Sequence, residues 1–112
     1  MPLKALVTTV LISAALATAA TADARVRLVS VSVGHPGSDA TLVAAITPSA
    51  TCGITVHYKS GPSRAKGLLA KRSIRGLVSW TWRVGTNTTR GRWPITITCG
   101  RAGTLRTSFV VR

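Results

Sequence analysis

Apolar and polar residues alternate along most of the chain after residue 24. The clearest stretch is 78–84, where valine or tryptophan occupies every second position, with Ser79, Thr81 and Arg83 between them. A two-residue repeat is typical of a β-strand with one buried face, and β-branched and aromatic side chains favour strands. No stretch of this region shows a helical repeat. We therefore predict six strands, at 25–33, 40–47, 52–59, 78–84, 92–99 and 104–111.

The apolar face of each predicted strand defines the expected core. We expect inward positions for Val29, Val31 and Val33; Leu42, Ala44 and Ile46; Cys52, Ile54, Val56 and Tyr58; Val78, Trp80, Trp82 and Val84; Trp93, Ile95, Ile97 and Cys99; and Leu105, Phe109 and Val111. The three tryptophans are then core residues rather than a stacking surface for sugars or bases. We expect Trp82 to be the most exposed of them, because it lies nearest the end of its strand.

Turn-forming residues separate the predicted strands. Glycine, proline, asparagine, serine or threonine dominate 34–39, 48–51, 85–91 and 100–103. The longest connection is 60–76, in which we expect one more short edge strand at 66–70. Six or seven short strands at this spacing predict an all-β fold, an antiparallel β-sandwich.

The first 24 residues have the pattern of a secretory signal peptide. Lys4 precedes an apolar run, and Ala22-Asp23-Ala24 has the small-x-small form that signal peptidase accepts. The alternative is an uncleaved membrane anchor, but the run is rich in alanine and threonine and only weakly apolar for a span. Cleavage leaves residues 25–112 as one domain of 88 residues. We expect no membrane span after cleavage, and a secreted, extracellular or envelope location.

Both cysteines, Cys52 and Cys99, lie in this domain. In an oxidising compartment an isolated pair is most simply a disulfide, whereas a metal site would need more histidine or acidic partners than the chain offers. Cys52 opens one predicted strand and Cys99 closes another, each on the inward face. If those two strands are antiparallel neighbours, the two sulfurs meet at the same end of the sheet, within the geometry of a disulfide.

The chain is strongly basic. It has 15 Lys and Arg against two Asp and no Glu, for a net charge of +13. Six of these cations, uninterrupted by an acid, form the candidate polyanion-binding site: Lys59, Arg64, Lys66, Lys71, Arg72 and Arg75. Outward strand positions add Arg83, Arg92 and Arg106. Such a surface attracts anionic envelope polymers, nucleic acid or anionic lipid headgroups. The alternative is that the charge serves only solubility and reflects an arginine-rich genome composition.

Candidate catalytic and metal-binding residues are few. His35, Ser38 and Asp39 occupy one predicted turn, but a working triad is usually held by separate rigid segments. We expect Asp39 to cap its own turn and His57 to be solvated on the outer face of its strand. We therefore expect no enzymatic activity, catalytic residue, metal site, cofactor or small-molecule substrate. Asn87-Thr88-Thr89 fits a glycosylation sequon, but a turn is the simpler interpretation.

Five runs form an ordered set of motifs, at 50–52, 58–63, 78–82, 84–86 and 93–99. Together they resemble the small bacterial immunoglobulin-like domains of secreted and surface-attached proteins, over about residues 40–111. The resemblance implies an immunoglobulin-like β-sandwich with a Cys52–Cys99 bridge, and a role as an adhesion, spacer or accessory module. Arginine at 83, 90 and 92, where neutral residues are common, makes a plain spacer less expected.

These observations together predict a secreted, non-enzymatic binding or structural module of the cell envelope that attaches to anionic polymers through its basic segment. The alternative function is a protein-interaction module that binds a protein partner at a sheet edge, with the charge serving only solubility.

Overall fold

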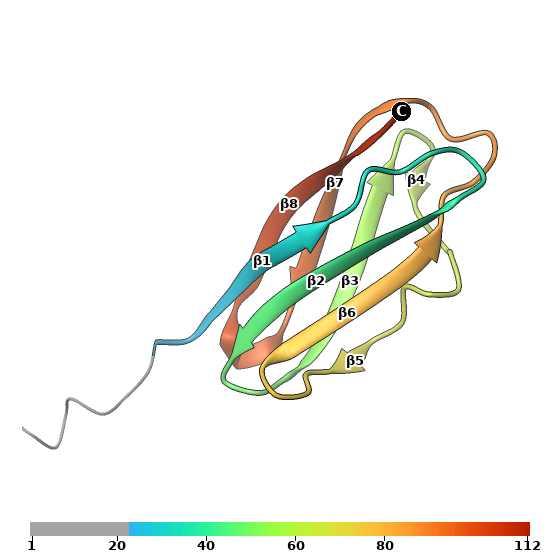
Figure 1. Cartoon of the computed structure of the whole chain (residues 1–112). Helices are drawn as coiled ribbons and strands as arrows, with labels where there is room; N and C mark the ends of the chain where they lie inside the picture. Colours follow the sequence, from blue (N-terminus) through green and yellow to red (C-terminus); the bar gives the residue numbers. More distant parts are fainter. Residues whose placement is uncertain (1–22) are drawn as a thin grey trace, which may run out of the picture.

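The computed structural model describes residues 23–112, which form two antiparallel β-sheets packed face to face (Figure 1). The predicted signal peptide therefore lies almost entirely outside the described residues. The first sheet has three strands in the order β1-β2-β6. The second has five, in the order β4-β3-β7-β8 with β5 also paired to β3. The elements are β1 (Arg25–Val31), β2 (Asp39–Thr47), β3 (Thr51–Tyr58), β4 (Gly61–Pro62), β5 (Lys71–Arg72), β6 (Leu77–Arg83), β7 (Gly91–Thr98), the 3₁₀ helix η2 (Gly100–Ala102) and β8 (Thr104–Val111).

The antiparallel sandwich predicted from the sequence is confirmed. All six predicted strands are present, and two additional strands of two residues each bring the total to eight. One sheet contains β1, β2 and β6, and the other contains β3, β7 and β8. Immunoglobulin-type sandwiches distribute their strands between the two sheets in the same way.

The core lies between the two sheets and follows the two-residue repeat. β2 buries Ala40, Leu42, Ala44 and Ile46, and β6 buries Val78, Trp80 and Trp82. From the other sheet, Phe109 on β8 meets Trp82 edge to face, with ring centroids 5.3 Å apart. Burial of these large apolar side chains is the main favourable term in folding.

The prediction for the inward face of β1 is confirmed for Val31 but wrong for Val29 and Val33. Val29 is 50% exposed and Val33 is 42% exposed, whereas Val26, Leu28 and Val31 pack against the core. The cause is an irregularity in the pairing with β2: Leu28 pairs with Ala44, but Ser30 pairs with the adjacent Val43. A bulge of this kind inserts one unpaired residue, so the inward positions change from even to odd numbers.

The predicted disulfide is confirmed. Cys52 and Cys99 are bonded, their Cα atoms are 4.1 Å apart, and both are fully buried. The bridge follows directly from the register of β3 and β7, in which Gly53 pairs with Thr98. It therefore joins neighbouring strands of one sheet. In antibody domains the conserved disulfide instead joins the two sheets.

The edge strand expected at 66–70 is absent, and pairing to β3 occurs on either side of that segment. β4 pairs with His57 and Tyr58, while β5 pairs with Thr51 and Cys52. Between them the chain leaves β3 and crosses to the edge of β6. A Cβ atom on Gly67 would lie 1.7 Å from the Thr81 carbonyl oxygen, so only glycine permits this approach. The chain at 66–70 therefore lies against β6 instead of pairing with β3.

Candidate functional site

The six predicted site residues lie along one side of the sandwich. We call them the basic strip: Lys59, Arg64, Lys66, Lys71, Arg72 and Arg75, all of them exposed. The strip begins just after β3, crosses the open side between the two sheets, and ends in the turn before β6. Gly61 pairs with Tyr58 and Lys71 with Cys52. Six residues of strand separate these two points, so the strip extends over about 20 Å.

Local interactions hold the strip in place. The indole Nε1 of Trp80 donates a hydrogen bond to the Leu69 carbonyl oxygen at 2.8 Å. The ammonium of Lys71 donates to the Ser79 carbonyl oxygen at 2.9 Å. Since a lysine ammonium has three N–H groups, two remain for an anion. In each bond one partner, Ser79 or Trp80, belongs to β6. This edge strand therefore supports the segment that carries the charge.

The strip ends in a tight hairpin turn. Arg75 and Gly76 both have positive φ, 54° and 79°. Ile74 and Leu77 exchange two backbone hydrogen bonds across the turn, of 2.8 and 3.0 Å. Two central residues with positive φ define the type I′ turn, whose twist suits antiparallel strands. The turn places the Arg75 side chain at its tip.

The positive charge is almost uncompensated. Residues 23–112 contain 14 basic side chains, all exposed, and two acids, Asp23 and Asp39. In this part of the chain the one ion pair joins Arg83 Nε to Asp39 Oδ1 at 3.7 Å, between two exposed side chains. No carboxylate is paired with the basic strip. Its field therefore extends into solvent over a Debye length, about 8–10 Å at ordinary salt.

A hollow lies at each end of the strip. The larger, about 640 Å³, is lined by Tyr58, Lys59, Ser60 and residues 85–89. Its lining offers hydroxyl groups, one amide and one ammonium, and no carboxylate. The smaller, about 340 Å³, is lined by Val43, Lys71, Arg72, Ile74, Leu77, Val78 and Ser79. A chain-like anion that follows the strip would pass both hollows.

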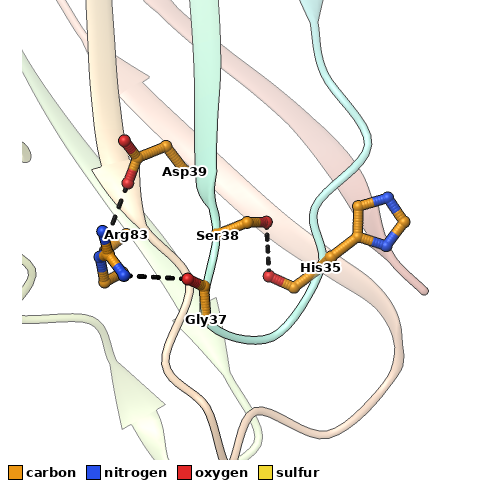
Figure 2. A network of polar contacts seen from close by, with 5 residues as sticks. All are labelled: His35, Gly37, Ser38, Asp39 and Arg83. Carbon is orange, nitrogen blue, oxygen red and sulfur yellow. Dashed lines mark hydrogen bonds and ion pairs between the residues drawn. The ribbon is translucent and has the colours of Figure 1, made fainter.

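His35, Ser38 and Asp39 are not arranged as a catalytic triad (Figure 2). The Ser38 hydroxyl donates to the His35 backbone carbonyl oxygen at 2.8 Å, and the imidazole Nδ1 lies 3.2 Å from the Arg112 carbonyl oxygen. The expectation that Asp39 caps its own turn is wrong, because its carboxylate faces Arg83. Arg83 also donates to the Gly37 carbonyl oxygen at 2.9 Å. These contacts fasten the loop before β2 to the end of β6.

The tryptophans belong to the core, but the expectation for Trp82 is wrong. Trp82 is 2% exposed, and Trp93 is the partly exposed one. The Nε1 atom of Trp82 donates to the Tyr58 hydroxyl at 3.1 Å, which allows the indole to be buried far along its strand. Trp93 donates from Nε1 to the Thr89 carbonyl oxygen and thereby holds the 85–89 wall of the larger hollow.

Two further polar residues, His57 and Tyr58, lie at the end of β3 in the second sheet. Burial raises the pKa of Tyr58 above its ordinary value of 10.0, although the hydrogen bond from Trp82 acts in the opposite direction. His57 is half-buried rather than fully solvated, and its Nε2 lies 3.3 Å from the Thr96 hydroxyl oxygen.

Asn87 is exposed in a turn, as expected from the sequence.

Among residues 23–112 there is no group of three or more His, Cys, Asp or Glu side chains placed to hold a metal ion. The same residues include no helix whose length and apolar character would let it cross a membrane. Neither family models nor curated proteins gave a match to the chain.

Sequence reasoning missed one feature of this region. Ile74 and Leu77 are large apolar residues, yet they are 74% and 46% exposed beside the basic strip. The signal for this was present, since Ile74-Arg75-Gly76-Leu77 has the form of a two-residue hairpin turn, whose flanking side chains lie at the end of the molecule.

Proposed function

We propose that this domain is a secreted, non-enzymatic module of the cell envelope that attaches to an anionic polymer through the basic strip. The observation that carries the proposal is the set of 14 exposed basic side chains with a single acid partner, six of them along one side. The resemblance to bacterial immunoglobulin-like domains supports a binding role, and the buried disulfide fits an oxidising compartment.

Binding would work mainly by charge. A flexible polyanion carries condensed counterions, and each phosphate or sulfate that meets a Lys or Arg releases one of them. Arginine adds direction, because its planar guanidinium can donate two parallel hydrogen bonds to one phosphate. The strip has Arg64, Arg72 and Arg75 for such contacts, spread over its length.

The alternative, binding of a protein partner at a sheet edge, is less well supported. Residues 61–72 pair with both ends of β3 and also lie against the edge of β6. The segment that holds the charge thus occupies the edges of β3 and β6, so β-addition would have to use the edge of β1 or β8. The charged side chains that it presents to solvent are all cationic.

We expect removal of four strip charges to weaken binding to long-chain polyphosphate. Changing Arg64, Lys66, Lys71 and Arg72 to alanine should lower the affinity about 100-fold at low salt. It should reduce the slope of log K against log salt concentration by about 3, since each phosphate contact contributes about 0.7. Fluorescence titrations at several salt concentrations measure both quantities.

A matched variant removes four charges elsewhere. Arg90, Arg101, Arg106 and Arg112 are exposed and lie outside the strip. Their replacement by alanine should cost less than tenfold in affinity, and both variants should keep the wild-type melting temperature within a few degrees. Equal losses in the two variants would mean that net charge alone attracts the polymer, and the strip would then not be the site.

A further inference from the structure

The end of the sandwich next to the disulfide exposes an aliphatic surface. Ile74 and Leu77 flank the Arg75-Gly76 turn and are 74% and 46% exposed. The Ile46 amide donates to the Gly76 carbonyl oxygen at 2.8 Å, which fastens the turn to the end of β2. The turn is therefore anchored to β2, and its two flanking aliphatic side chains lie in solvent.

Neighbouring strands extend this surface over the outer face of the three-stranded sheet. Leu77 pairs with Ala45, and Ser79 pairs with Val43, so these side chains share the face that points away from the core. Val43, Ile74 and Leu77 also line one hollow of about 340 Å³. We call these three residues the aliphatic corner.

Cations surround the aliphatic corner. Lys71 and Arg72 line the same hollow, and Arg75 is at the tip of the turn. On the far side, β1 places Arg27 opposite Ala45 and Arg25 opposite Thr47. The acid of this sheet, Asp39, lies at the other end of β2, six residues or about 20 Å from Ala45. The corner is thus apolar at its centre and positive at its rim.

We propose that the aliphatic corner docks on a lipid bilayer that carries anionic headgroups. A charged polymer alone gives no reason to expose two large aliphatic residues, whereas a bilayer offers both an anionic surface and an apolar interior. Ile74 and Leu77 would enter the boundary between headgroups and acyl chains, while Lys71, Arg72 and Arg75 remain at headgroup level. The docking proposal rests on the proposed function only for the role of the cations, because the exposure of Ile74 and Leu77 is an independent observation.

Co-sedimentation with vesicles tests the proposal. The wild-type domain should bind vesicles of phosphatidylcholine with 30% phosphatidylglycerol at least tenfold more tightly than vesicles of phosphatidylcholine alone, as an expected order of magnitude for several cations at the surface. The double variant Ile74→Ser, Leu77→Ser should lose at least tenfold in affinity for the anionic vesicles. Its affinity for polyphosphate should stay within about twofold of the wild type, since no charge is changed.

Controls separate this proposal from the polymer proposal. Val33 is also exposed but follows β1 at the opposite end of the molecule, so Val33→Ser should leave vesicle binding unchanged. Soluble glycerol 3-phosphate, which has the headgroup chemistry without the bilayer, should not displace the protein. Full vesicle binding by the double variant, or binding of polyphosphate without binding of anionic vesicles, would overturn the docking proposal alone. Failure to bind either probe would overturn both proposals.

Discussion

Replacing Cys52 and Cys99 by alanine is expected to lower the free energy of unfolding by about 4 kcal/mol. The two cysteines are 47 residues apart, so the bridge closes a loop that includes most of the strands. Loop closure removes conformational entropy from the unfolded chain, and a loop of this length gives that value. A domain of this size has a total stability of about 4–13 kcal/mol, so the bridge supplies a large share of it.

Thermal unfolding followed by near-ultraviolet circular dichroism measures the effect. The midpoint should fall by about 20 °C relative to the oxidised wild type. Wild-type protein treated with a reductant is the matched control, since it loses the bond without losing the sulfur atoms, and it should unfold at a similarly reduced temperature. An unchanged midpoint in both samples would mean that the β3–β7 pairing is stable without the bridge.

Changing Gly67 to alanine is expected to destabilise the domain by about 3 kcal/mol. The new Cβ atom would lie 1.7 Å from the Thr81 carbonyl oxygen and 3.3 Å from the Trp82 Cα atom. Because those atoms belong to β6, the loop must move instead. Moving the loop breaks the hydrogen bond from buried Trp80 to Leu69 and leaves the indole N–H without a partner.

Urea unfolding followed by tryptophan fluorescence measures this change. Gly53→Ala is the matched control, because nothing lies within 4 Å of a Cβ atom there and its backbone has no positive φ. We expect that variant to stay within about 0.5 kcal/mol of the wild type. If Gly67→Ala were equally mild, the chain at 66–70 would not be packed against β6, and the position of the basic strip would need revision.

The strands could be predicted because each has one buried face, and burial on one face imposes a two-residue repeat on the sequence. Val78, Trp80 and Trp82 are buried while Ser79, Thr81 and Arg83 are exposed, as the pattern requires. The disulfide was predicted by the same logic, because inward cysteines at the start of one strand and the end of another lie together if those strands are antiparallel neighbours.

The failures have a different cause, because they depend on contacts between residues far apart in sequence. The bulge in β1 arises from its register with β2, and Val29 is as apolar as the residues that are buried. The course of 66–70 depends on Gly67 meeting Thr81, and a glycine in a basic loop gives no sign of that partner. Trp82 is buried because Tyr58, 24 residues away, accepts its N–H.

The candidate site was predictable in its residues but not in its surroundings. Charge is a property of composition, and side chains of Lys and Arg are nearly always exposed, so the six strip residues could be named from the sequence. Their support by β6 and their proximity to the aliphatic corner depend on how the strip crosses between the two sheets. Because of that crossing, the six cations of the basic strip lie in a row along one side of the molecule.

Lysine footprinting tests most directly whether the basic strip binds an anionic polymer. All three lysines of residues 23–112, Lys59, Lys66 and Lys71, belong to the strip, so lysine acylation by an amine-acylating reagent reports on the strip alone in this part of the chain. At low extents of modification, with polyphosphate present, mass spectrometry should show acylation of all three slowed at least fivefold, an expected order of magnitude for occupied cations. Phenylglyoxal labelling of Arg90, Arg101, Arg106 and Arg112 should change less than twofold. Unchanged lysine reactivity, or equal protection of those arginines, would contradict the strip as the binding site.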